Sequence, residues 1–243
     1  MSFPLTFVSD FDGVWTNPKR ELQALHQTVQ TALRRMCGWS QEHLEEVYAH
    51  FREQVLHSPH QYGWRIDGVF SSFVDEDYFA VPTSIAQYID DAPCEDSVEL
   101  KSLILQEFET VLSFVDSCYA STCENFRSEV DHDLAEGSAR VLQWLLDNDV
   151  NVVFVTNAPT EKITTWFAHH GFSVDDGRST APGSSRLRVY GRAGKQHLGP
   201  SGRSLDFCGR NVQCDRPQYR EVLERESPDL VIGDVLSLDL SQP

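Results

Sequence analysis

The chain of 243 residues carries a formal net charge of −17, with 37 acidic residues against 20 lysines and arginines. This acidic excess argues against nucleic acid or an anionic membrane as a partner, because both are negatively charged. The sequence contains no apolar run long enough to span a bilayer and no signal peptide, so we expect a cytoplasmic protein whose six cysteines are reduced. The spacing of Cys208 and Cys214 is not that of common zinc knuckles.

The first predicted element is a short buried strand, residues 5–8, that is followed by two aspartates and a glycine. Because an unpaired buried carboxylate is costly, Asp10 and Asp12 should lie just beyond the strand, facing a cation or a reacting group. Ligands bind at the carboxyl ends of strands in parallel sheets, and Gly13 allows a sharp turn there. One carboxylate that acts as a nucleophile beside another that moves protons is a way to transfer a phosphoryl group.

The next part of the chain, residues 18–127, shows helical periodicity and no convincing alternating strand. Pro18 and Gly38 bound one predicted helix, and Ser40 caps the next. Residues 59–82 are irregular and aromatic, and a long helix is expected at about 98–126. A parallel crossover needs only about a dozen residues, so we interpret 15–130 as an inserted helical domain that caps the site. The alternative is a helical layer packed on the sheet.

The α/β pattern resumes near residue 134. A second buried strand, 151–155, ends in Thr156 and Asn157, and a helix follows it. Residues 173–214 are rich in Gly, Ser and Arg and contain one predicted strand, 187–190. A third buried strand, 229–232, ends in Gly233 and Asp234, with Asp239 five residues later.

Three apolar strands therefore end in small or acidic residues, and the carboxyl edge of a parallel sheet brings such ends together. We predict an α/β protein with a doubly wound, Rossmann-like parallel sheet. Residues 1–14 and 131–243 form this core, and 15–130 form the mainly helical insert.

Four segments, in this order, resemble the motifs of the haloacid dehalogenase (HAD) superfamily. Asp10-Phe11-Asp12-Gly13-Val14 resembles the first motif and Val155-Thr156-Asn157 the second. Arg216-Pro217 resembles the third, and the segment from Gly233-Asp234 to Asp239 resembles the fourth. The third motif usually carries lysine, so Lys195 and Lys162 compete with Arg216 for this role. The resemblance also implies that the helical insert is a C1-type cap.

The resemblance implies a Mg²⁺-dependent phosphohydrolase that acts on a small phosphorylated metabolite. Asp10 would attack phosphorus to give an aspartyl-phosphate, and Asp12 would protonate the leaving oxygen and then activate water. Asp10 and Asp234 would bind Mg²⁺ with the backbone carbonyl of Asp12. Asp239 would bind a metal-bound water or orient Arg216.

The phosphoryl group itself would be bound by Thr156, Asn157 and Arg216. Asp12 favours phosphate chemistry over dehalogenation, because a departing halide needs no proton. A phosphomutase of the same fold and a non-catalytic HAD-like binding protein are the alternatives. Neither the substrate nor the oligomeric state follows from the sequence.

Members of the family usually continue past the fourth motif with a helix and often another strand, whereas this sequence ends at Pro243. If the natural protein is longer, we expect an uncovered sheet edge here, which favours association. Alternatively, residues 237–243 cover that edge.

Overall fold

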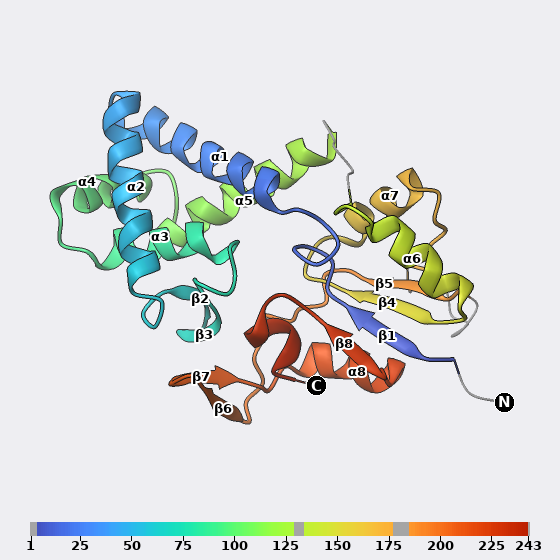
Figure 1. The fold of residues 1–243 in the computed structure, drawn as a ribbon. Coiled ribbons are helices and arrows are strands. Elements are labelled where there is room, and N and C mark those ends of the chain that lie inside the picture. Colours follow the sequence, from blue (N-terminus) through green and yellow to red (C-terminus); the bar gives the residue numbers. More distant parts are fainter. Residues whose placement is uncertain (1–3, 129–133, 177–184, 243) are drawn as a thin grey trace. The chain divides into compact units, whose positions relative to one another are not determined.

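A computed structural model describes residues 4–128, 134–176 and 185–242 of the chain. The chain divides into two compact units (Figure 1). One consists of Met1–Pro18 with Asp131–Pro243 and contains a parallel sheet. The other, Lys19–Val130, is mainly helical. The second connection between them, which we expected near residues 128–134, lies outside the described residues at 129–133.

The sheet of the first unit has four parallel strands in the order β5-β4-β1-β8. These strands are β1 (Thr6–Ser9), β4 (Asn151–Val155), β5 (Leu187–Tyr190) and β8 (Leu230–Ile232). Val8 of β1 lies opposite Val153 of β4 on one side and Val231 of β8 on the other. Because β1 lies between β4 and β8, the residues that follow these three strands meet at one edge.

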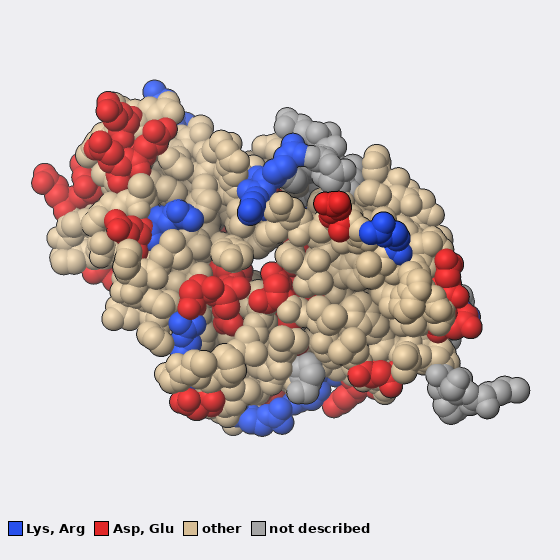
Figure 2. Space-filling model, in the orientation of Figure 1, with Lys and Arg blue, Asp and Glu red and all other residues tan. Residues whose placement is uncertain are grey.

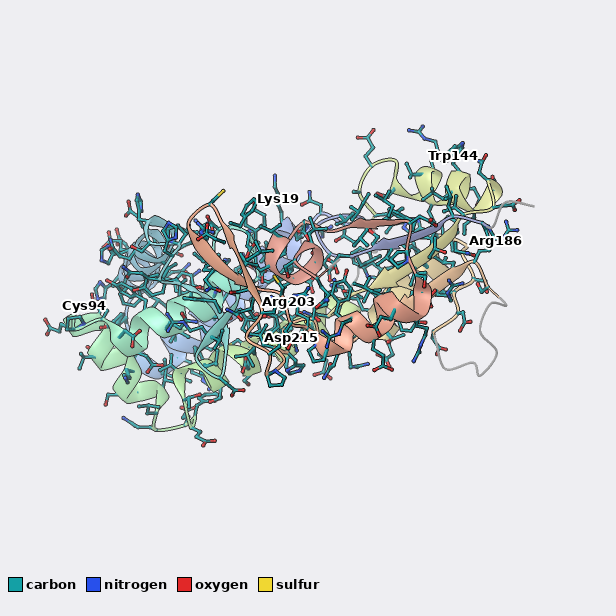
Figure 3. All side chains as sticks on the ribbon, turned by 90° about the horizontal axis from the view of Figure 1, so that it is seen from below. Lys19, Cys94, Trp144, Arg186, Arg203 and Asp215 are labelled. Atoms are coloured by element: carbon teal, nitrogen blue, oxygen red, sulfur yellow. The ribbon has the colours of Figure 1, made fainter. Side chains whose placement is uncertain are left out.

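Helices cover both faces of this sheet: α6 (Ser138–Asp147) and α7 (Thr160–His169) pack on one face, and α8 (Pro217–Glu226) packs on the other. The alternation of side chains along β4 explains the two layers, since Phe154 joins the core with α7 while Val153 joins the core with α8. Trp144 of α6 is 61% exposed (Figure 3). The structure thus confirms the predicted doubly wound α/β class.

Three details of the sheet unit differ from the sequence prediction. Trp15, which we assigned to the insert, is buried in the sheet unit, with its indole Nε1 donating to Ser9 Oγ at 2.8 Å. β8 lies at the sheet edge, and Leu230 is 55% exposed. A hairpin of β6 (Ser204–Phe207) and β7 (Arg210–Gln213) was not predicted. Every residue of β6 is exposed, so burial imposes no alternation on its sequence.

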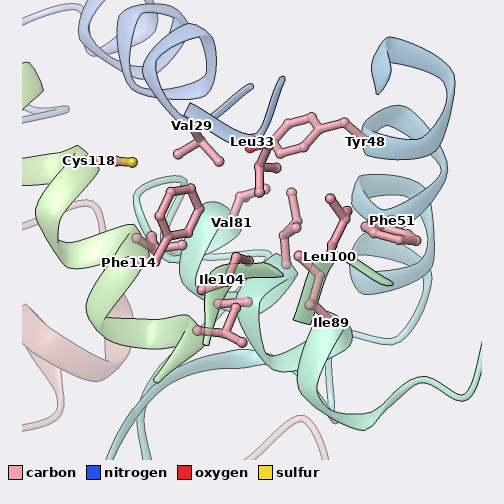
Figure 4. Close-up of a cluster of buried hydrophobic side chains, with 14 of the residues drawn as sticks. Val29, Leu33, Tyr48, Phe51, Val81, Ile89, Leu100, Ile104, Phe114 and Cys118 are labelled. Atoms are coloured by element: carbon pink, nitrogen blue, oxygen red, sulfur yellow. The ribbon is translucent and has the colours of Figure 1, made fainter. Parts of the chain in front are cut away.

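The helical unit contains α1 (Lys19–Cys37), α2 (Gln41–His57), α3 (Ala80–Asp91), α4 (Glu95–Ile104) and α5 (Val111–Ser128). As predicted, Ser40 caps α2, and its side chain accepts a hydrogen bond from the His43 N–H. The apolar faces of all five helices meet in one core, part of which Figure 4 shows. Burial of this shared face stabilises the unit far more than the helix propensities do.

Two elements of this unit were missed. Residues 59–82 contain a hairpin of β2 (Gly63–Ile66) and β3 (Val69–Phe73), whose turn residues Asp67 and Gly68 both have positive φ. Asp-Gly is a strong hairpin signal that the sequence did contain. The long helix expected at 98–126 is instead split between α4 and α5. Thr110 caps the start of α5: its N–H donates to the Ser113 hydroxyl, and its own hydroxyl accepts from the Ser113 N–H.

Acidic groups are spread over the face of the molecule that Figure 2 shows. Among the described helices, none combines the length and the apolar character needed to cross a bilayer.

A histidine inside the helical unit makes stability depend on pH. His26 on α1 is hydrogen-bonded through Nδ1 to the Tyr48 hydroxyl at 2.8 Å, and burial, with a contribution from Arg52, lowers the pKa of His26 to about 4. The unfolded chain would bind a proton at the ordinary pKa of about 6.5. The free energy of unfolding should therefore fall by about 2 kcal/mol as the pH drops from 6.5 to 4.

Urea unfolding of the whole chain at pH 4.5 and pH 7 tests this expectation. His26→Gln should flatten the pH dependence, whereas the exposed His60→Gln should leave it unchanged. If the free energy of unfolding depended on pH equally in the wild type and in His26→Gln, His26 would not be the source of the pH dependence.

Candidate active site

Three carboxylates meet beyond the ends of β1 and β8. Asp10 follows β1, while Asp234 and Asp239 follow β8, and each offers an oxygen within 4.8 Å of the others. The Asp10 backbone N–H donates to the Ile232 carbonyl at 2.9 Å, so the pairing of β1 with β8 continues to the site. The predicted convergence of the first and fourth motifs is therefore present in the fold.

A buried lysine lies between two of these carboxylates. Lys195 Nζ is 2.6 Å from Asp10 Oδ1 and 2.7 Å from Asp239 Oδ1, and the residue is 2% exposed. Burial lowers the pKa of Lys195, but the Asp10 and Asp239 carboxylates outweigh burial and hold it above its usual value. Burial raises the pKa of Asp10 to about 8, although the Lys195 ammonium opposes the rise. The lysine is the fixed positive charge of the cluster.

Lys195 thus occupies the position that we expected for Arg216. Arg216 is fully buried, and its Nη1 donates to the Lys195 backbone carbonyl at 2.5 Å. The Lys195 N–H donates to Asn157 Oδ1 at 2.9 Å. Two predicted phosphate-binding residues therefore hold the backbone of the lysine from both sides. The sequence signal for Lys195 was its place after Gly194 in the loop that follows β5.

Asp239 lies on a short π-helix, Leu236–Leu240, and both its carboxylate oxygens are engaged. Oδ1 accepts from Lys195, and Oδ2 accepts from the Val235 N–H at 3.1 Å. We expected Asp239 to bind a metal-bound water or to orient Arg216. The cation that it contacts is Lys195, and its second oxygen closes the loop that carries Asp234.

Gly13 brings the first motif against the fourth. Its φ is +80°, and a Cβ built on it would lie 1.9 Å from Asp234 Oδ2. Only glycine leaves room for the Asp234 carboxylate beside this turn. The contact is the reason that the Asp-x-Asp-Gly sequence needs its glycine.

Asp12 and Thr156 lie at the same sheet edge with different partners. Asp12 Oδ1 is 3.0 Å from Nζ of Lys162, which is 6% exposed. Lys162 was a candidate for the third-motif charge, but it pairs with Asp12. The Thr156 hydroxyl accepts from the Ala158 N–H at 3.1 Å, and among the described residues no acceptor for its own hydrogen is found.

The donor set fits a hard divalent cation. Carboxylate oxygens are the ligands that Mg²⁺ prefers, and it is usually held by one or two of them. Because both Asp239 oxygens are already hydrogen-bonded, Asp10 and Asp234 are the side chains that would hold such an ion.

No protein-family model and no curated protein matches this chain. Two solved structures are similar to it over 98% of its length. One is the putative HAD-hydrolase YfnB from Bacillus subtilis bound to magnesium, with 11% identity, a TM-score of 0.43 and 83% of that chain covered. The other is a 2-haloacid dehalogenase from Pseudomonas syringae pv. Tomato DC3000, with 12% identity, a TM-score of 0.39 and 81% covered. Because both TM-scores are below 0.5, we interpret the site from its own geometry.

The contact between Gly13 and Asp234 predicts a selective effect of Gly13→Ala. We expect millimolar Mg²⁺ to raise the melting temperature of the wild type. The added methyl group must displace the Asp234 carboxylate, so this expected rise should shrink by more than half in Gly13→Ala. Gly171→Ala is the matched control, because Gly171 has a φ of +81° with nothing within 4 Å of its added Cβ. Both variants should lose about 1 kcal/mol of stability through backbone strain. Equal shifts in melting temperature with Mg²⁺ in the two variants would contradict Asp234 as a metal ligand.

The raised pKa of Asp10 predicts that Mg²⁺ binding depends on pH. A metal binds the carboxylate and must displace the proton below pH 8, so affinity should weaken as the pH falls from 8.5 to 6.5. The loss should approach about tenfold per pH unit. Titration calorimetry at the two pH values measures it, and equal affinities would contradict a protonated Asp10.

Proposed function

We propose that this protein is a Mg²⁺-dependent phosphohydrolase of the HAD superfamily that acts on a small phosphorylated metabolite. The observation that carries the proposal is the Lys195 ammonium between Asp10 and Asp239 at the strand ends, with Asp234 beside them. A nucleophilic carboxylate, a fixed cation and a second acidic residue two positions away are the groups that phosphoryl transfer through an aspartyl-phosphate requires.

The reaction would proceed in two displacements at phosphorus. An Asp10 oxygen forms a bond to phosphorus while the ester oxygen leaves and takes a proton from Asp12. The Asp12 carboxylate then removes a proton from water, whose oxygen attacks phosphorus and releases inorganic phosphate from Asp10. Lys195 stays on Asp10 Oδ1 and orients the nucleophile.

Asp10 and Asp234, with the Asp12 backbone carbonyl, would hold Mg²⁺, which when bound neutralises the repulsion between carboxylates and phosphate. Thr156 and Asn157 would lie against the phosphoryl oxygens, with Thr156 as a hydroxyl donor. We further propose that the helical unit Lys19–Val130 serves as the cap that selects the substrate.

Release of phosphate from a panel of phosphorylated metabolites, with and without Mg²⁺, tests the proposal. Asp10→Asn should lower turnover at least about 10³-fold, because the amide cannot form the acyl-phosphate. The variant should lose stability but remain folded, because Asp239 still pairs with Lys195. The exposed Asp147→Asn is the control with unchanged turnover.

Near-normal phosphate release by Asp10→Asn would reject the aspartyl-phosphate. Halide release from 2-haloacids without phosphatase activity would indicate a dehalogenase. Transfer of phosphate to a second hydroxyl of the substrate would indicate a mutase, and phosphate binding without turnover a binding protein.

A further inference from the structure

Lys162 is buried in the first turn of a helix, where a positive charge does not stabilise the helix. It lies in the first turn of α7, which begins at Thr160, and its backbone N–H donates to the Pro159 carbonyl. The N-terminal end of a helix carries partial positive charge, so a cation there is unfavourable. Removing an ammonium group from water adds a further cost. Lys162 nevertheless is only 6% exposed.

Asp12 offsets part of both costs. Lys162 Nζ lies 3.0 Å from Asp12 Oδ1, and the ring centre of Trp166, one helical turn further on, lies 5.8 Å from the same nitrogen. Trp166 is itself 7% exposed, so the ammonium is shielded from water. The ion pair joins the turn after β1 to the start of α7.

The two buried lysines of the site therefore serve different carboxylates. Lys195 contacts Asp10 and Asp239, whereas Lys162 contacts Asp12. Within the described part of the chain, Asp12 Oδ1 accepts from Lys162 and no hydrogen bond to Oδ2 is found. Lys162 therefore fixes Asp12 Oδ1, and Asp12 Oδ2 is available to exchange a proton.

We propose that Lys162 is a positioning residue that orients the Asp12 carboxyl for proton transfer to the leaving oxygen. The inference rests on the proposed phosphohydrolase function. Lys162 acts through Asp12, so its importance should depend on how much the leaving group needs a proton. An alkyl phosphate expels a strongly basic alkoxide and depends on the acid, whereas p-nitrophenyl phosphate expels a weakly basic phenolate and does not.

The test compares kcat/KM for these two ester classes in Lys162→Met, which keeps the aliphatic stem and removes the charge. This ratio covers the steps up to release of the alcohol and so leaves out hydrolysis of the aspartyl-phosphate, in which Asp12 would act on the same intermediate for both esters. We expect kcat/KM for an alkyl phosphate to fall about 10- to 100-fold and kcat/KM for p-nitrophenyl phosphate to fall less than about threefold. Lys162→Arg, which keeps a cation, should recover part of the alkyl phosphate activity. In an Asp12→Asn background, Lys162→Met should cause no further loss.

Equal losses for both esters would overturn the inference, since they would indicate direct phosphate binding or a general structural defect. A further loss in the Asp12→Asn background would overturn it as well. If Lys162→Met fails to fold, the same comparison is made with Lys162→Gln, which also removes the charge but keeps a polar head group.

A measurement without substrate separates this inference from the proposed function. In ¹⁵N-lysine NMR, a buried, paired ammonium should give a signal protected from exchange with water, and Asp12→Asn should abolish it for Lys162. A wild type that hydrolyses no phosphate ester rejects the function, and the NMR result then shows whether Lys162 still holds the Asp12 carboxyl. A Lys162 signal unchanged by Asp12→Asn overturns it.

Discussion

The site depends on one interaction, the buried Lys195 ammonium held between the buried Asp239 carboxylate and the partly buried Asp10 carboxylate. Asp10 and Asp239 would repel each other across the strand ends without it, and each would pay the cost of burial alone. Breaking such a pair by removing one partner leaves an uncompensated buried charge, which is strongly destabilising. The remaining polar residues of the site can be understood as the groups that keep this lysine in place.

The support reaches Lys195 through its backbone as well as its side chain. Asn157 accepts from its N–H, Arg216 donates to its carbonyl, and Asp239 accepts from its ammonium. These partners come from the loop after β4, the start of α8 and the loop after β8. A side chain whose backbone and terminal ammonium are both held in place reorganises little during a reaction, which is what electrostatic stabilisation requires.

Close packing of backbone against side chain completes the geometry. Gly13 lies against the Asp234 carboxylate, and a Cβ on Gly233 would lie 2.2 Å from the Asp239 Cβ. The two glycines let consecutive turns approach without a side chain between them. The sequence placed both glycines next to the aspartates, but only the packed strands show what each one makes room for.

The strands and their acidic ends could be predicted because each is a local pattern of apolar residues followed by polar ones. The sequence could not predict which lysine belongs to the site. Arg216-Pro217 is a local signal for the start of a helix, whereas Lys195 reaches Asp10 only through tertiary packing. The two hairpins were missed for different reasons. The Asp67-Gly68 turn was present in the sequence, whereas exposed β6 has no burial pattern.

The charges at the site also explain how an acidic protein could hold an anionic substrate. The field of a chain with net charge −17 is screened over about 8 Å at physiological ionic strength. The charged groups within the site therefore determine whether an anionic substrate can bind there. Once a bound cation has displaced the Asp10 proton, Asp10, Asp12, Asp234 and Asp239 carry four formal negative charges, and Lys162 and Lys195 carry two positive ones. The remaining formal charge of these six side chains, −2, is the charge that one divalent cation would balance. With that ion bound, a phosphate would meet a site of no net charge among these groups, whereas without it the excess of carboxylates would repel the substrate.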